Sequence, residues 1–270
     1  MSTQAAGPVA SLPMYDHPAV RGATDALWSA LARRLAAEGV PAPIGLDRRA
    51  DHASVWREPG LVLSQTCGYP YATALRGAVR LVATPRYRAL GCEGARYRSV
   101  LLVRSGDPAG TLADLRGRRV ACNAADSQSG YNALRAAVAP LARGGRFFAG
   151  SLLTGAHAAS AAAVVAGSAD LCAVDCVTWG LLACHEPALT ARLRVLGWTA
   201  SAPGLPLITG PATPLASVQA AVQAVMADPD LATAREALLI EGIEAVPDAA
   251  YDAVLTMEHR ARVLDYPALA

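Results

Sequence analysis

The sequence predicts an α/β fold built as two lobes, each with a parallel or mixed sheet flanked by helices. Short apolar runs with strand character alternate with segments of helical periodicity along most of the chain, and this alternation is typical of helix-covered sheets. The length of 270 residues suffices for two lobes, because single domains commonly hold about 100–150 residues. Polar Gly/Pro turns within 101–117 and 196–210 adjoin strand patterns and predict two crossings between the lobes.

These crossings set the predicted boundaries. Lobe one is expected to comprise residues 1–103 and 200–270, and lobe two residues 104–199. Two lobes joined by two crossings form a hinge with a cleft, which is a common arrangement in proteins that close around a ligand.

In lobe one, a helix is expected from about Pro18 to Glu38, and later helices have apolar residues at i, i+3 and i+4. The strand patterns of this lobe are "VASLPM", "APIGLD", "GLVLSQ", "VRLVATP" and "YRSVLLVRSG", and after "LPLITG" the chain is nearly all helical, with "PLASVQAAVQAVM" and "YDAVLTMEHRARVL". In lobe two, the strands "RRVACNA", "FFAGSLLTG", "ADLCAVDC" and "LRVLGWTAS" alternate with helices at "TLADLRG", 128–143, 157–166 and "VTWGLLACHEP".

The composition excludes several classes of protein. A hydrophobic content of 53% and a charged content of 17% are those of a globular protein. The net charge of +2, from 24 basic and 22 acidic residues, gives no support for nucleic-acid binding. No run reaches the roughly 18 apolar residues that a spanning helix needs, so no membrane insertion is expected. The N-terminus lacks a secretory-signal pattern, which indicates either a cytoplasmic location for the chain as it stands or the mature form of an exported protein.

The six cysteines are scattered rather than grouped as in a disulfide-rich domain. Cys172 and Cys176 have CxxxC spacing, but the second pair that zinc usually needs is absent, so neither a metal nor a cofactor is expected. Buried small hydrophobic side chains are the simpler interpretation. Cys67 and Cys92 both flank glycine turns, and a disulfide between them stays open.

The most unusual stretch is Asp126-Ser127-Gln128-Ser129-Gly130, which joins a predicted strand to a predicted helix. Ligands of open α/β sheets lie beyond the carboxyl ends of strands, where helices begin. A helix start has free N–H groups and a partial positive charge, two hydroxyls add donors, and Gly130 allows close approach of the backbone. The stretch therefore predicts an oxyanion cradle, with a plain helix cap as the alternative. The P-loop and nucleophile-elbow motifs are absent.

Two further strand ends carry candidate ligand residues. His157 stands at the start of a predicted helix, where its imidazole is able to donate a hydrogen bond to an anion. Asp175 ends an apolar strand, where a buried carboxylate is costly unless it is paired. Beside an oxyanion it would accept a hydrogen bond from a protonated ligand. A structural histidine and a helix-capping aspartate are the alternatives.

Lobe one contributes polar and aromatic residues at its strand ends. Gln65 ends the strand "GLVLSQ", Thr66 and Tyr69 follow it, and Tyr15 follows the first strand. Tyrosine rings can wall a cleft and donate an O–H, although each tyrosine taken alone is better explained by packing.

In their order and spacing, "NAADSQSGYNALR", "TGAHAAS" and "AVDCVTW" resemble the PhnD-like family of phosphate-, phosphite- and phosphonate-binding subunits of ABC transporters. The resemblance runs through residues 8–210 and is most specific over 120–180. It implies a two-lobed periplasmic-binding-protein type 2 (venus-flytrap) architecture that closes on a tetrahedral oxyanion in the interlobe cleft. It also implies an ABC permease as partner and the periplasmic location typical of the family.

The resemblance assigns the family's ligand contacts to particular positions. Gln128 stands where a second hydroxyl is common in the oxyanion motif, which implies a change in ligand size or preference. The residues that fill the family's ligand positions are Tyr15, Tyr69, Ser127, Gln128, Ser129, Gly130, His157 and Asp175, with Tyr71 as an alternative aromatic position.

Two other functions stay open at this point. A cytoplasmic ligand sensor on the same fold would need a partner to report binding, since no output domain is recognisable. An enzyme would use Cys176 and His157 as a thiol–imidazole pair, but no metal signature, cofactor loop or orienting third residue accompanies them. We therefore expect a binding protein and not an enzyme.

Overall fold

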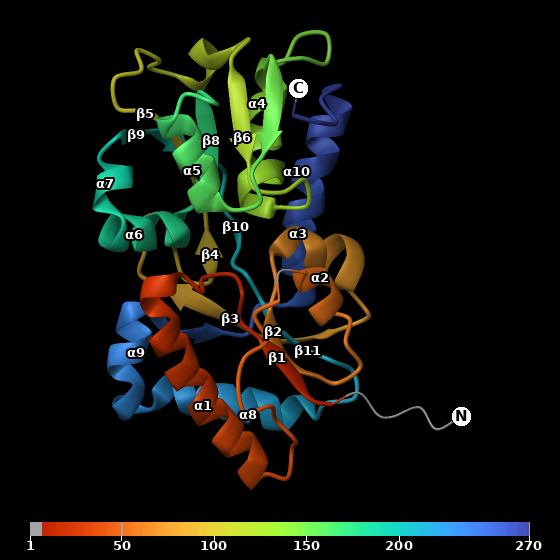
Figure 1. Ribbon diagram of the computed structural model, residues 1–270. Helices are drawn as coiled ribbons and strands as arrows, with labels where there is room; N and C mark the ends of the chain where they lie inside the picture. Colours follow the sequence, from red (N-terminus) through yellow and green to blue (C-terminus); the bar gives the residue numbers. More distant parts are fainter. Residues whose placement is uncertain (1–6, 50, 270) are drawn as a thin grey trace. The chain divides into compact units, whose positions relative to one another are not determined.

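The computed structural model describes residues 7–49 and 51–269 and divides into two compact units (Figure 1). Unit 1 comprises the described residues up to Cys67 together with 71–88 and 204–248. Unit 2 comprises residues 68–70, 89–203 and the described residues from Ala249 onward. The C-terminal segment thus groups with unit 2, whereas the sequence analysis placed 200–270 in lobe one.

Unit 1 is built on a mixed five-stranded sheet with the order β1-β2-β11-β3-β12. β1 is parallel to β2, while β11 is antiparallel to both β2 and β3, and β12 is antiparallel to β3. The strands are β1 (Val9–Ser11), β2 (Leu61–Gln65), β3 (Arg80–Tyr87), β11 (Leu207–Thr209) and β12 (Ile240–Glu244).

The longest helix of unit 1 buries one face because its apolar residues recur at helical spacing. Leu27, Leu31 and Leu35 are buried at i, i+4 and i+8, and Trp28 beside them donates from Nε1 to the Pro43 carbonyl at 3.2 Å. The helical segments are η1 (Pro18–Val20), α1 (Arg21–Ala37), α2 (His52–Val55), η2 (Tyr71–Leu75), α8 (Leu215–Ala227), η6 (Pro229–Leu231) and α9 (Ala232–Ala237). Of these, α8 and α9 pack against α1.

In unit 1, one predicted strand is absent and one strand was not predicted. The segment "APIGLD" is irregular rather than a strand: Ile44 is fully exposed, and Pro41 and Pro43 have no N–H to donate to a ladder. The region after residue 210 is not all helical, because β12 pairs with β3 and completes the sheet. Edge pairing of this kind depends on a distant strand, so the local pattern did not indicate it.

Unit 2 contains a second mixed sheet with the order β7-β6-β8-β5-β9. β6 is parallel to both β7 and β8, whereas β5 is antiparallel to β8 and β9. The strands are β5 (Ser99–Arg104), β6 (Arg119–Cys122), β7 (Gly150–Leu153), β8 (Leu171–Asp175) and β9 (Leu193–Trp198), and a separate pair joins β4 (Arg96–Tyr97) to β10 (Ala202–Pro203). The carboxyl ends of β6, β7 and β8 therefore share one edge.

Successive side chains along the central strands of unit 2 point to opposite faces of the sheet, and because nearly all are apolar they form two cores, one on each face. Leu101, Val103, Val120, Cys122, Leu171 and Ala173 are buried on one face, and Val100, Leu102, Ala121, Cys172 and Val174 on the other. α5 covers the second face, while α4 and α10 lie on the first (Figure 1).

The C-terminal segment belongs to unit 2 because its apolar residues complete the first of these cores. Ala261, Tyr266 and Leu269 are buried with Leu134 and Val138 of α4. The helical segments of the unit are α3 (Gly68–Pro70), η3 (Leu112–Leu115), η4 (Gln128–Asn132), α4 (Ala133–Val138), η5 (Ala139–Leu141), α5 (His157–Val165), α6 (Cys176–His185), α7 (Pro187–Thr190) and α10 (Asp252–Val263), with η7 (Asp248–Tyr251) at the boundary of the two units.

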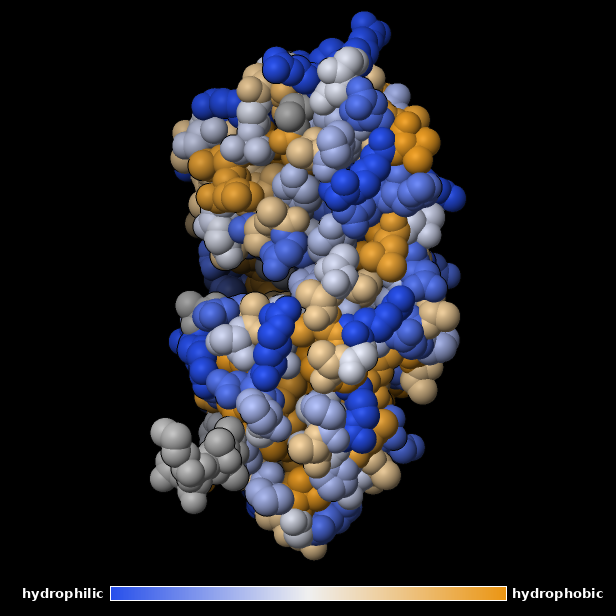
Figure 2. All heavy atoms as spheres, turned by 90° about the vertical axis from the view of Figure 1, so that its right-hand side faces the viewer, coloured by the Kyte–Doolittle hydropathy of each residue, from blue (hydrophilic) through white to orange (hydrophobic). Residues whose placement is uncertain are grey.

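The surface, the helices and the cysteines of the structure can be compared with the classes of protein that the composition argued against. Hydrophilic and hydrophobic residues are interspersed on the face drawn in Figure 2. Among the described residues, none of the helices combines the length and the apolar character needed to cross a membrane. None of the six cysteines forms a disulfide, so the disulfide between Cys67 and Cys92 that the sequence left open does not form in this structure.

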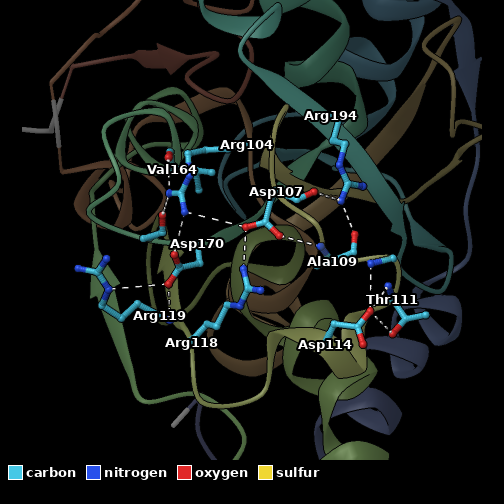
Figure 3. A network of polar contacts seen from close by, with 12 residues as sticks. Arg104, Asp107, Ala109, Thr111, Asp114, Arg118, Arg119, Val164, Asp170 and Arg194 are labelled. Atoms are coloured by element: carbon cyan, nitrogen blue, oxygen red, sulfur yellow. Dashed lines mark hydrogen bonds and ion pairs between the residues drawn. The ribbon is translucent and has the colours of Figure 1, made fainter.

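A network of arginine and aspartate side chains ties together the sheet edge at which β6 and β8 begin (Figure 3). Arg118 donates from Nη1 to Asp107 at 2.6 Å, and the Asp107 side chain is only 3% exposed. Asp170 accepts from Arg104 Nη2 at 3.1 Å and from the backbone N–H of Arg119 at 3.0 Å. These bonds fix the loops at the edge opposite the carboxyl ends of β6 and β8.

We expect Asp107→Ala to destabilise the protein by about 2–4 kcal/mol, because it leaves the Arg118 guanidinium and the Ala109 N–H without their acceptor. Urea unfolding measures this change in free energy. Asp114, an exposed aspartate that caps a nearby 3-10 turn, provides the control: Asp114→Ala should cost clearly less. Equal losses for the two variants would contradict a buried role for Asp107.

Candidate ligand-binding site

The stretch from Asp126 to Gly130, called the oxyanion stretch below, lies at the carboxyl end of β6 and begins a helical segment. Ser127 is the N-cap residue, with φ −77° and ψ 129°, and its Oγ accepts from the Gly130 N–H at 3.0 Å. Gln128–Asn132 form a π-helical turn that continues directly into α4. The structure thus contains the cap that the sequence analysis weighed as the alternative. One hydroxyl forms this cap, which leaves the second, on Ser129, for other contacts.

Ser129 and His157 are neighbours, although 28 positions separate them in the chain. The Ser129 Oγ lies 2.9 Å from His157 Nε2, and His157 is the first residue of α5, just beyond β7. The Ser129 carbonyl accepts from the Ser99 hydroxyl at 2.8 Å. Parallel pairing of β6 with β7 explains the encounter, because it places both helix starts at one edge of the sheet.

His157 is neutral at neutral pH. Burial lowers the pKa of His157 to about 4, although a hydrogen bond with the backbone of Ala173 opposes the shift. A neutral imidazole has one donor and one acceptor nitrogen. With the ring proton on Nδ1, as a hydrogen bond to the Ala173 carbonyl requires, Nε2 accepts from the Ser129 hydroxyl. His157 therefore orients Ser129 and brings no positive charge to this edge of the sheet.

Gly130 is required by its neighbours in this structure. A Cβ atom there would lie 1.8 Å from Asn123 Oδ1 and 3.1 Å from His157 Cε1, so any larger residue would displace both side chains. Asn123 Oδ1 is buried and has no hydrogen-bond partner among the described residues. The sequence analysis did not single out Asn123, although it directly follows the apolar run of β6.

Asp175 caps α6, as the alternative interpretation held. Its Oδ1 accepts from the N–H groups of Val177 at 2.8 Å and Thr178 at 3.2 Å, and the residue is 2% exposed. Asp175 also pairs with Ser99 in the register of β8 and β5. Since the Ser99 hydroxyl donates to Ser129, the sheet brings Asp175 to the same edge as the oxyanion stretch.

Gln128 points away from the serine hydroxyls and into the helices. It is fully buried, its Oε1 accepts from Asn132 Nδ2 at 2.7 Å, and its Nε2 donates to the Met257 sulfur at 3.2 Å. Asn132 Nδ2 also donates to the Val254 carbonyl at 3.0 Å. Gln128 thereby ties the start of the helical segment to α10.

Tyr69 joins the same buried polar network from α3. Burial raises the pKa of Tyr69, and hydrogen bonding to Glu258 adds to the increase, while the bond to Arg135 opposes it. Arg135 is 4% exposed and donates from Nη2 to Asn132 Oδ1 at 2.6 Å. Sequence reasoning missed Asn132, Arg135 and Glu258. The sequence pattern that could have indicated Asn132 and Arg135 is the i, i+4, i+7 spacing of Gln128, Asn132 and Arg135, which places them in one polar stripe on the helix.

The remaining predicted residues, Tyr15, Gln65 and Thr66, lie in unit 1. Gln65 Nε2 donates to the Tyr87 hydroxyl and to the Leu205 carbonyl, both at 3.1 Å. The Tyr15 ring meets the Tyr87 ring edge-on, with centroids 5.0 Å apart. The structure thus groups Tyr15 and Gln65 around Tyr87, while Thr66 is fully buried after β2. Their role as ligand contacts stays a prediction.

The geometry does not favour nucleophilic catalysis by Cys176 or a metal centre. Contact with Cys92, burial and the Asp175 charge all raise the pKa of the Cys176 thiol, which disfavours the thiolate nucleophile. His157 Nε2 is engaged with Ser129. Among the described residues, no group of three or more His, Cys, Asp or Glu side chains is arranged to hold a metal ion.

Comparison with known proteins identifies the family. Residues 10–251 match the family of periplasmic substrate-binding proteins of phosphonate ABC transporters. The chain belongs to this family. It is therefore a substrate-binding protein of an ABC transport system and not an enzyme, so the alternative with Cys176 and His157 as a catalytic pair is wrong. None of the curated proteins is similar enough to match the chain.

Solved structures share the fold at low identity. PhnD1 from Prochlorococcus marinus, in complex with methylphosphonate, is 12% identical over 94% of this chain and 98% of that one, with a TM-score of 0.75. The binding-protein component of an ABC phosphonate transporter from Pseudomonas aeruginosa (PA3383) is 15% identical over 96% and 88%, with a TM-score of 0.74. XAC2383 from Xanthomonas citri, bound to ATP, is 16% identical over 96% and 98%, with a TM-score of 0.71. The predicted periplasmic-binding-protein type 2 fold is confirmed.

His157 should make the stability of the protein depend on pH. Its folded-state pKa of about 4 lies below the ordinary 6.5, so between these values the unfolded chain binds the proton more readily. Stability should fall by up to roughly 2–3 kcal/mol as the pH drops from about 6.5 to about 4. Urea unfolding across this range measures the slope, and His157→Gln should reduce it. An imidazole pKa of 6 or more by NMR would contradict the assignment.

Proposed function

We propose that the Ser127–Gly130 stretch of unit 2 binds a tetrahedral phosphorus oxyanion (phosphate, phosphite or a phosphonate) for uptake through an ABC permease. The observation that carries this proposal is the Ser129–His157 contact of 2.9 Å at the start of a helix. The family match supports the ligand class and the permease partner. The methylphosphonate bound to PhnD1 and the phosphonate transporter of P. aeruginosa point to the same chemistry.

The proposed site holds an anion with neutral donors. Residues 126–130 contain no lysine or arginine, so hydroxyls, backbone N–H groups and the helix N-terminus supply the attraction. Arg135, further along the helical segment, donates to Asn132 Oδ1 and to the Pro267 carbonyl and lies 3.8 Å from Glu258 Oε1. Its charge is thus balanced within unit 2, and a hydrogen bond from a neutral donor to an ionised ligand contributes about 1.5–3 kcal/mol.

Asp175 is the proposed source of selectivity. A carboxylate at the same edge of the sheet as Ser129 repels an anion that carries no proton, and accepts a hydrogen bond from one that does. Phosphate keeps a proton at neutral pH, whereas sulfate has none. The site would therefore prefer phosphate-type over sulfate-type anions.

Asp175→Asn should narrow the preference for phosphate over sulfate by at least about tenfold, or roughly 1.4 kcal/mol. Asparagine still caps a helix, so the fold should persist, while the repulsion of the unprotonated anion is lost. Calorimetric titration with both anions measures the ratio of dissociation constants. Asp114→Asn, a capping aspartate of the η3 turn, is the matched control and should keep the wild-type ratio. An unchanged ratio for Asp175→Asn would rule out the selective role.

A thermal-shift screen with phosphate, phosphite, methylphosphonate and sulfate tests the ligand class. A ligand at 100 times its dissociation constant stabilises a protein by about 2.7 kcal/mol. Ser129→Ala removes the hydroxyl beside His157 and should weaken binding of the stabilising anion by about 10–100-fold. Ser105→Ala, at an exposed serine of the same unit, should leave binding unchanged. Stabilisation by none of the phosphorus anions would overturn the proposed function.

A further inference from the structure

Two of the free cysteines in unit 2 lie in contact. Cys92 Sγ and Cys176 Sγ are 3.4 Å apart, although 84 positions separate them in the chain. Cys92 belongs to the segment that follows Arg88, the last residue of unit 1 before the chain enters unit 2, and Cys176 is the first residue of α6. The contact therefore joins the entry segment of unit 2 to the helix that Asp175 caps.

Gly91 makes this contact possible. Its φ is +103°, and a Cβ atom there would lie 2.6 Å from a ring atom of Trp198 and 3.1 Å from Cys176 Cβ. A larger residue would collide with the indole and would strain the backbone. The glycine thus lets the entry segment press directly on the start of α6 and holds the two thiols together.

The two thiols differ in their access to solvent. Cys92 is partly exposed and lines a surface pocket of about 280 Å³ together with Leu90, Glu93, Arg98 and Trp198. Cys176 is 1% exposed, and the contact with Cys92, burial and the Asp175 charge raise the pKa of its thiol. A small oxidant in solution therefore meets Cys92 first, and Cys176 is placed to react second.

We propose that Cys92 and Cys176 form a reversible disulfide by exchange with a small-molecule disulfide such as oxidised glutathione. The Cys92 thiolate attacks one sulfur of the oxidant and releases the first glutathione thiol, which leaves a mixed disulfide on Cys92. Cys176 then gives up its proton to solvent as its sulfur attacks Cys92 Sγ and releases the second glutathione thiol. Two protein thiols are oxidised, and the oxidant is reduced to two thiols.

The disulfide should stabilise unit 2 and the Asp175 cap. Bond formation shortens the Sγ–Sγ distance to about 2.05 Å, and the cross-link spans a long loop, which restricts the unfolded chain. Because Cys176 directly follows Asp175, the bond also holds the backbone whose N–H groups, on Val177 and Thr178, donate to that carboxylate. An effect of oxidation on ligand binding at Asp175 rests on the proposed function, whereas the disulfide itself does not.

The test oxidises the purified, ligand-free protein with oxidised glutathione and compares it with the reduced form. We expect the loss of two titratable thiols, an intact mass lower by about 2 Da, and a peptide that links Cys92 to Cys176. The melting temperature should rise by at least about 5 °C, and the amide hydrogens of Val177 and Thr178 should exchange more slowly. Dithiothreitol should reverse all five changes.

Matched variants separate this pair from the other thiols. Cys92→Ser, at the partly exposed position, should fold and abolish both the mass loss and the melting shift, whereas Cys184→Ser, at an exposed cysteine, should leave both intact. A glutathione adduct that persists on Cys92, retention of all thiols, or a disulfide that still forms in Cys92→Ser would overturn the proposal. None of these readouts uses the ligand, so failure here is distinct from failure of the proposed function.

Discussion

The parallel pairing of β6 with β7 and β8 is the constraint on which the candidate site depends. Parallel strands end at one edge of a sheet, and the helices that follow them begin there. This places the starts of η4, α5 and α6 together, and with them Ser129, His157 and Asp175. β5 runs antiparallel to β8, so its first residue lies at this same edge. That residue, Ser99, pairs with Asp175 and donates to the Ser129 carbonyl, which links the two positions.

Two basic side chains near this edge of the sheet, His157 and Arg135, add no unbalanced positive charge to the candidate site. Burial lowers the pKa of His157 to about 4, so the imidazole is uncharged when it meets Ser129. Arg135 is buried nearby along the helix but has Asn132 and Glu258 as partners. The proposed site would therefore recognise an oxyanion by hydrogen-bond geometry rather than by excess charge. That suits discrimination between tetrahedral anions of similar size, because the arrangement of protons then decides which ligand is held.

Two glycines show how tightly unit 2 is packed at the candidate site and at the Cys92–Cys176 contact. A side chain at Gly130 would collide with Asn123, and one at Gly91 would collide with Trp198 and Cys176. Each glycine admits a close approach between segments that lie far apart in the chain. At Gly130 the approach positions the oxyanion stretch against His157, and at Gly91 it brings Cys92 to Cys176. In both places the space that glycine leaves is filled by another side chain of the protein.

The sequence by itself determined the α/β alternation, the two mixed sheets and the strand-end positions of Ser127, Ser129, His157 and Asp175, because apolar periodicity and turn chemistry are local properties. Only the tertiary structure decided which groups meet. Gln128 turns into the helices, and the C-terminal segment joins unit 2, because distant side chains there complete a hydrogen bond or a core. Strand β12 and the Cys92–Cys176 contact likewise depend on partners many residues away, which a local pattern does not encode.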